Sequence, residues 1–105
     1  MNAESNENLV VIKLKKPLDY NGVIYDEIKM DLENLKGKDA REIKNELARR
    51  KLGPVVPGAE ILSEDYLLGL AAKACTDPIG SDGFEHLYIK DYNKVVSEVS
   101  AFLRA

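Results

Sequence analysis

The stretch SEDYLLGLAAKACT, Ser63–Thr76, decides how this chain folds. Between Tyr66 and Cys75 it holds one charged residue, Lys73, in a chain in which 31% of residues are charged. Ser63 is a favourable N-cap, so the stretch predicts a helix. An apolar helix of this kind either forms the centre of the protein's own core or keeps part of its surface for another protein.

The helical spacing places apolar residues over about 200° of this helix, roughly twice the width usual for a surface helix. Only Tyr66, Gly69 and Lys73 are left to face water. We therefore expect the helix to lie between two other elements. The apolar residues form two adjacent strips, one of Leu67, Leu70, Ala71 and Ala74, the other of Leu68, Ala72 and Cys75.

Residues 10–32, VVIKLKKPLDYNGVIYDEIKMDL, alternate apolar and polar side chains on both sides of an Asn-Gly pair. This period of two predicts an antiparallel hairpin with one buried face. A three-residue loop, Tyr20–Gly22, sets Leu14 against Ile28, whereas a two-residue loop opposes apolar and charged residues. We therefore expect the three-residue loop. Pro17 has no N–H to donate, so its strand is expected at an edge.

Two further helices are expected. Asp39 and Glu42 form a pattern like a capping box at the start of one, and Gly53-Pro54 is expected to end it. The other follows Asp91 as N-cap. Its apolar residues fall within about 120°, which predicts that it packs on one strip of the Ser63 helix while the hairpin covers the second strip. These residues are Tyr92, Val95, Val96, Val99, Phe102 and Leu103.

The predicted fold class is therefore α+β: an N-terminal antiparallel β-hairpin followed by three helices packed around one core. The 105 residues suffice for one domain. We assign residues 9–105 to this domain and expect residues 1–8, which are polar and acidic, to form a disordered tail.

Composition argues against several classes of function. The net charge is −3 and the basic residues are scattered along the chain, which does not favour nucleic-acid binding. No apolar run approaches the roughly 20 residues that a membrane span requires. Cys75 and His86 are the only residues of their types, so no metal site or catalytic triad is expected. We expect neither an enzyme nor a cofactor.

The order of several segments resembles the tail assembly chaperone family of Mu-like contractile-tailed phages and prophages. The resemblance runs from about Leu9 to Leu103 and is carried by segments rather than by a catalytic motif. The acidic N-terminus and the GPVVPG linker have no counterpart in it. The segments that carry it are LKKPLDYNG, IKMDLENL, GKDAREI, LLGLAAKAC and LYIKDYNKVVSEVSAFL.

This resemblance implies a non-catalytic assembly factor in the cytoplasm of a bacterial host. Such chaperones are thought to coat the helical tape measure protein while tail tube protein polymerises around it, and they are absent from the mature virion. Members are often made together with a longer frameshifted form that recruits tube protein. A coating role is also compatible with a homo-oligomer.

A chaperone of this kind needs a reversible apolar groove with a charged rim. We expect the groove along the Ser63 helix and its neighbour, with a rim from the charged helix near Asp39 and the acidic loop near Asp82. The candidate partner-binding residues are Tyr66, Leu67, Leu70, Ala74, Tyr92, Val96 and Phe102.

Two other classes of function stay open. One is a small structural virion protein, for tail completion or the baseplate, which would be found in purified virions. The other is a regulator that binds nucleic acid through Arg41, Arg49, Arg50 and Lys51, which would show salt-sensitive DNA binding.

Overall fold

The computed structural model describes residues 9–52 and 55–105. It shows a two-stranded hairpin followed by helices, which confirms the α+β class. The predicted tail, residues 1–8, lies outside the described residues. The elements are β1 (Val10–Tyr20), β2 (Val23–Met30), η1 (Leu32–Asn34), α2 (Gly37–Arg49), η2 (Glu60–Leu62), α3 (Glu64–Ala74), α4 (Ser81–Phe84) and α5 (Ile89–Arg104).

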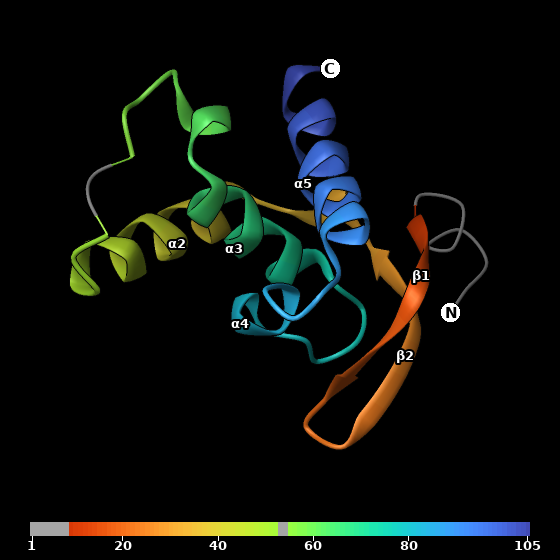
Figure 1. Ribbon diagram of the computed structural model, residues 1–105. Helices are drawn as coiled ribbons and strands as arrows, with labels where there is room; N and C mark the ends of the chain where they lie inside the picture. Colours follow the sequence, from red (N-terminus) through yellow and green to blue (C-terminus); the bar gives the residue numbers. More distant parts are fainter. Residues whose placement is uncertain (1–8, 53–54) are drawn as a thin grey trace.

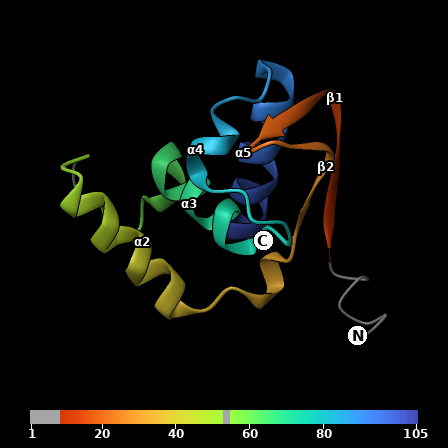
Figure 2. The ribbon, with the colours of Figure 1, turned by 90° about the horizontal axis from the view of Figure 1, so that it is seen from below.

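The main elements follow one another across the molecule in the order α2, α3, α5 and hairpin (Figure 1). The same order is seen after a rotation by 90° (Figure 2). All buried apolar side chains of the described residues belong to one cluster, so these elements share one core. None of the described helices has both the length and the apolar character needed to cross a membrane.

Helix α3 lies at the centre of this core, as its sequence predicted. Helix α5 packs against one side of it and α2 against the other. Of the three residues expected to face water, Lys73 is exposed and Gly69 is half-buried, but the prediction is wrong for Tyr66. Tyr66 is 5% exposed, with the Lys44 ammonium 5.7 Å from the centre of its ring. A Cβ on Gly69 would lie 2.8 Å from Cγ2 of Ile43 on α2.

The hairpin does not cover the second strip of α3. Instead β1 packs on α5, and α2 takes the place expected for the hairpin. Backbone hydrogen bonds join the hairpin to α3 where the two elements end. There the Asp31 N–H donates to the Ala74 carbonyl at 2.8 Å, and the Thr76 N–H donates to the Lys29 carbonyl at 2.9 Å.

The turn of the hairpin has two residues, so the predicted three-residue loop is wrong. Asn21 and Gly22 both have positive φ, 53° and 82°, and Tyr20 pairs with Val23. This left-handed geometry suits the twist of a hairpin, and Asn-Gly adopts it at low cost. The local preference of the Asn-Gly pair therefore sets the register beside the turn.

A bulge in β1 then restores the burial of the apolar residues. Between Lys13 and Leu18, four residues of β1 face only Asp26 of β2. Beyond the bulge Ile12 pairs with Ile28, and both side chains are buried, as is Leu18. The bulge thus lets the turn take its preferred form while the apolar side chains on both sides of it reach the core.

The bulge is fixed by a buried carboxylate on α5. Asp91 has no exposed surface, and its carboxylate accepts the Lys15 N–H at 2.9 and 3.1 Å and the Lys16 N–H at 3.3 Å. The expected role of Asp91 as N-cap is wrong, because α5 begins two residues earlier, at Ile89. Pro17 lies in the same bulge, where its missing N–H interrupts no pairing with β2.

Of the caps predicted for the other two long helices, the one at Ser63 is confirmed and the one at Asp39 is wrong. Ser63 is the N-cap of α3, and its hydroxyl oxygen accepts the Tyr66 N–H at 3.2 Å, which confirms the prediction. Helix α2 begins at Gly37, so Asp39 lies inside its first turn. There its carboxylate accepts the Lys36 N–H at 2.9 Å. Asp39 is therefore the acidic partner of a cap rather than the cap itself.

Helix α2 ends at Arg49, before the Gly53-Pro54 pair expected to stop it, and that pair lies outside the described residues. Lys51 takes a positive φ of 57°, which reverses the chain direction. The Leu52 N–H then donates to the Leu47 carbonyl at 3.0 Å. This left-handed ending normally favours glycine.

Candidate functional site

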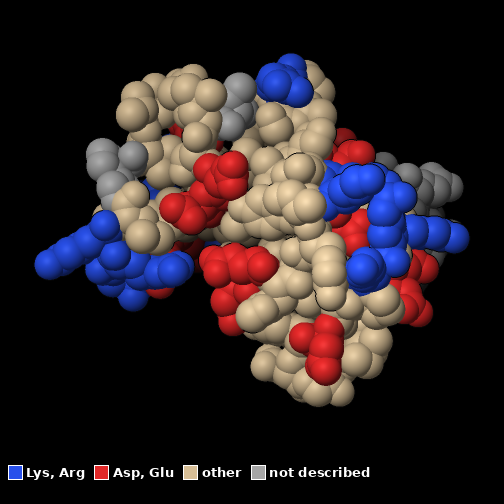
Figure 3. Space-filling model, in the orientation of Figure 1, with Lys and Arg blue, Asp and Glu red and all other residues tan. Residues whose placement is uncertain are grey.

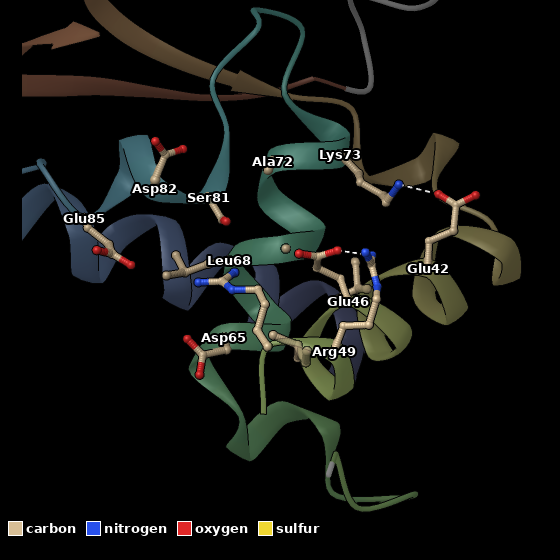
Figure 4. A pocket seen from close by; sticks show the side chains of 14 residues that line it. Glu42, Glu46, Arg49, Asp65, Leu68, Ala72, Lys73, Ser81, Asp82 and Glu85 are labelled. Carbon is tan, nitrogen blue, oxygen red and sulfur yellow. Dashed lines mark hydrogen bonds and ion pairs between the residues drawn. The ribbon is translucent and has the colours of Figure 1, made fainter. Parts of the chain in front are cut away.

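A groove of about 650 Å³ lies between α2, α3 and α4. This volume lies within the range of sites that hold ligands or partner side chains. Figure 4 shows α2 on one side of the groove, the α4 segment on the other and α3 along the base. The groove therefore joins residues that are far apart in the sequence.

Small residues on α3 create the hollow. Gly69 lets Ile43 of α2 approach closely, and Ala72, one turn further on, leaves open space beside it. Leu47 and Leu68 complete the apolar base, and both are mostly buried. The base is therefore apolar and firmly packed, as a surface for apolar side chains of a partner requires.

The rim of the groove is charged and partly paired within the protein. Glu46 and Arg49 form an ion pair along α2, and Lys73 of α3 binds Glu42 of α2 at 2.5 Å (Figure 4). Asp65 lines the groove without forming an ion pair with any described residue. The same is true of Arg50 and Glu85, so charges of both signs remain available to a partner.

Asp82 on α4 is held by the hairpin. Its carboxylate accepts the Tyr20 hydroxyl at 2.9 Å, and the Tyr20 oxygen in turn accepts the Gly80 N–H at 3.3 Å. Gly83 permits this contact, because a Cβ there would lie 3.0 Å from the Tyr20 ring and 2.7 Å from Cγ2 of Ile79. The α4 wall of the groove is thus fixed to the tip of the hairpin.

Four of the predicted partner-binding residues are buried in the protein's own core. Tyr66, Leu67, Leu70 and Ala74 are at most 6% exposed. A partner would reach them only if the helices around α3 separated. Their role in binding therefore stays a prediction that requires the fold to open.

The other three, on α5, are half-buried. Val96 and Phe102 pack against the edge of the core, and neither lines the groove. The Tyr92 hydroxyl donates to Oε1 of Glu64 on α3 at 2.7 Å. This bond to a carboxylate, together with partial burial, raises the pKa of Tyr92 to about 12. The structure thus does not gather the seven predicted residues into one surface.

The rim elements named from the sequence do border the groove, since α2 and the loop near Asp82 form its two walls. The apolar base of the groove was not predicted from the sequence. Gly69 and Ala72, three residues apart, were assigned to a solvent-facing position and to a core strip. Small residues at this spacing let another element pack closely, and this was the signal available in the sequence.

Cys75 and His86, the single cysteine and the single histidine of the sequence, do not line the groove. Cys75 is half-buried, and burial raises the pKa of its thiol, so its thiolate is scarcer at neutral pH than that of an ordinary cysteine. His86 is exposed. Among the described residues, no group of three His, Cys, Asp or Glu side chains could hold a metal ion.

Comparisons with protein-family models, with curated proteins and with solved structures find no match for this chain. The groove and its charges are therefore the main physical basis for a functional proposal.

Proposed function

We propose that this protein is a non-catalytic tail assembly chaperone that binds the tape measure protein of a phage or prophage and keeps it soluble while the tail tube assembles. The identity of the client rests on the sequence resemblance. The observation that supports binding of a client is the groove between α2, α3 and α4, with its apolar base and charged rim.

The groove suits an amphipathic helix. Helix-in-groove recognition requires an apolar trough into which the partner places one row of side chains, about one from each turn. Ile43, Leu47 and Leu68 provide the apolar base of such a trough, and Ala72 leaves room at its centre. A long helical client with exposed apolar stripes offers many segments of this kind.

The rim predicts the charges of the client helix. Asp65 and Glu85 favour basic side chains along the edge nearest α4, whereas Arg50 favours an acidic one along α2. Exposed ion pairs add little affinity and are screened by salt. The complex is therefore expected to exchange rapidly, as a chaperone that leaves the finished assembly must.

The wider role follows from the same resemblance. A longer frameshifted form of the chain would bring tail tube protein to the coated client, and both forms would act in the cytoplasm of the bacterial host and be absent from the mature virion. A slippery heptamer near the stop codon, with an overlapping downstream reading frame, would support this arrangement.

The decisive experiment is co-expression with the tape measure protein that the resemblance predicts to be encoded beside this chain. We expect the tape measure protein to move into the soluble fraction and to co-purify with the chaperone. If it stays insoluble and nothing co-purifies, the chaperone function is wrong. Recovery of the chain from purified virions would instead support the structural class of function.

A pair of matched variants tests the groove. Ala72→Arg places a long side chain in the groove, and we expect it to reduce client recovery at least about tenfold, corresponding to about 1.4 kcal/mol of binding free energy. Asn45→Arg adds the same side chain to an exposed position of α2 that does not line the groove. Equal client recovery with both variants would show that the client binds elsewhere.

A further inference from the structure

A second surface combines acidic, apolar and basic residues in a fixed order. Its acidic end, Asp82 and Glu85, is shared with the α4 wall of the groove, and the rest lies outside the groove. Its acidic end is formed by the α4 segment, its apolar centre by the turn that enters α5, and its basic end by the start of α5 and the bulge of β1. We call it the split-charge patch. Its residues are Asp82, Glu85, Tyr88, Ile89, Lys90, Lys15 and Lys16.

The centre of the patch is apolar and open. Tyr88 is 58% exposed and Ile89 is 67% exposed, although they are adjacent and begin the longest helix of the chain. The Lys16 ammonium lies 4.6 Å from the centre of the Tyr88 ring, which joins the apolar centre to its basic end. These two adjacent side chains form the apolar part of the patch, between its acidic and basic ends.

The charges at both ends are available. Glu85, Lys15, Lys16 and Lys90 are exposed, and none of them forms an ion pair within residues 9–52 and 55–105. In Figure 3, acidic side chains gather over α4 and the start of α3, and basic ones gather over β1 and the start of α5. Both ends are visible in this one view, so they lie on the same face of the molecule, where acidic side chains also lie beside the basic end.

The patch is also held in position by contacts beneath it. The Asp91 carboxylate binds the backbone of Lys15 and Lys16, which fixes the basic end against α5. The bond from the Tyr20 hydroxyl to Asp82 fixes the acidic end. A surface whose backbone is already ordered loses less conformational entropy when it binds a partner.

We propose that this patch joins two copies of the chain in a twofold-symmetric dimer. A twofold axis through the apolar centre places the acidic end of one copy on the basic end of the other, and the reverse contact forms at the same time. Such self-complementarity is what an isologous interface requires, and twofold dimers are the most common protein oligomers. In the dimer Tyr88 and Ile89 of the two copies cover one another.

A second copy fits the patch better than other occupants do. A nucleic acid or an acidic peptide would be attracted by the three lysines but repelled by Asp82 and Glu85. A basic partner would be attracted by Asp82 and Glu85 but repelled by the three lysines. A partner can form ion pairs at both ends only if its own acidic and basic groups lie in the reverse order. A second copy of the chain, related by a twofold axis, has its charges in this order.

The patch is small, so the dimer is expected to be weak. Interfaces below about 1,000 Å² form transient complexes, and we expect a dissociation constant on the order of 10–100 µM in 50 mM salt. The charged ends are exposed, so raising the salt to 0.5 M is expected to weaken association about tenfold. The proposal does not depend on the chaperone function, because the test uses this chain alone.

Charge reversal in the full-length protein tests the interface. In the dimer of Glu85→Lys, the new lysine faces Lys90 of the other copy, and in the dimer of Lys90→Glu two acidic side chains face one another. Each variant is expected to be monomeric in sedimentation equilibrium, with an unchanged circular dichroism spectrum. The double variant E85K/K90E is expected to dimerise like the wild type, because exchange of the two charges preserves self-complementarity.

A mixture of the two single variants is the most specific test of the interface. Equal amounts of Glu85→Lys and Lys90→Glu are expected to form a heterodimer, because every charge then faces its opposite. Lys38→Glu and Glu33→Lys reverse exposed charges outside the patch and are expected to dimerise like the wild type. Ile89→Ser removes part of the apolar centre and is expected to weaken the dimer about tenfold.

Several results would overturn the proposal. One is a wild-type chain that stays monomeric at about 500 µM in 50 mM salt. The others are a mixture of Glu85→Lys and Lys90→Glu that does not associate, and assemblies larger than dimers. Binding of single-stranded DNA that Lys90→Glu abolishes, with no self-association, would assign the lysines to a nucleic-acid partner instead.

Discussion

The two sides of α3 differ in how completely they are covered. On the side of α5, Val95 and Val99 have no exposed surface, and Ala71 of α3 is equally buried. On the side of α2, Gly69 touches Ile43 while the surface beside Ala72 stays open and forms the groove. One apolar helix thus supplies both the centre of the core and the base of a candidate binding site, which are the two roles that its sequence left open.

The difference follows from side-chain size. Branched valines on α5 fill the space against α3, and close packing of this kind stabilises the core. On the other side α3 presents glycine and alanine, so α2 approaches closely at Gly69 and leaves a hollow beside Ala72. We expect changes on the α5 side to affect folding strongly, and changes in the groove to affect binding more than folding.

The largest effect is expected at Asp91, which joins α5 to the bulge of β1. Asp91→Ala leaves the N–H groups of Lys15 and Lys16 without their acceptor, and we expect it to lower the free energy of unfolding by about 2–4 kcal/mol. Urea denaturation followed by circular dichroism measures this loss. Asp91→Asn keeps one acceptor oxygen and is expected to lose less. Glu98→Ala, at an exposed position of the same helix, is the control, and an equal loss in both alanine variants would contradict the role of Asp91.

The next largest loss of stability is expected where α2 touches α3. Alanine normally stabilises a helix relative to glycine by up to about 1 kcal/mol. At Gly69, however, the new Cβ would lie 2.8 Å from Cγ2 of Ile43, which is itself buried. We expect Gly69→Ala to lower the free energy of unfolding by about 1–2 kcal/mol.

A double-mutant cycle with Ile43→Ala isolates this contact. If the contact with Ile43 causes the loss, Gly69→Ala becomes neutral or stabilising once Ile43 is truncated. A loss that is the same in both backgrounds would place its cause elsewhere.

A smaller change in stability, this time an increase, is expected at the end of α2. Lys51 has a φ of 57°, which is unfavourable for a residue with a side chain. Lys51→Gly is expected to raise the free energy of unfolding by about 0.5–1 kcal/mol, measured as a higher urea midpoint with an unchanged slope. Lys38→Gly, inside the same helix, is expected to destabilise, and a similar result for both variants would contradict the role of φ.

The smallest effect concerns the bond from Tyr92 to Glu64, which joins α5 to the start of α3. The folded state raises the pKa of Tyr92 from 10.0 to about 12. A raised pKa means that the protonated hydroxyl is favoured by folding, so this contribution is complete below pH 10 and is lost as the pH rises through about 12. We expect a few tenths of a kcal/mol, because the pair is exposed.

Absorbance titration of the tyrosines tests this bond. In the wild type Tyr92 is expected to ionise near pH 12, and in Glu64→Gln its pKa is expected to move back toward 10. Tyr92→Phe removes the late step and identifies it. A late step that persists in Tyr92→Phe would belong to Tyr66, whose pKa is raised by burial.

Local preference and periodicity were enough to predict the α+β class, the Ser63 cap and the central position of α3, because these depend on residues that are close in the sequence. The same reasoning gave a wrong register for the hairpin. It assumed a continuous pairing, whereas the Asn-Gly turn imposes its own geometry and a bulge at Leu14–Pro17 absorbs the mismatch. That bulge is stable because Asp91, on an element far away in the sequence, accepts its N–H groups.

The candidate site was likewise predicted only in part. The sequence by itself determined that α3 needs cover on two sides and that α2 and the loop near Asp82 carry charge. Only the tertiary structure decided that α2, not the hairpin, covers the second side, and that Gly69 and Ala72 leave a groove there. Helical periodicity shows how many sides of a helix are apolar, but the sizes and shapes of both partners decide which element packs on each side and where a hollow remains.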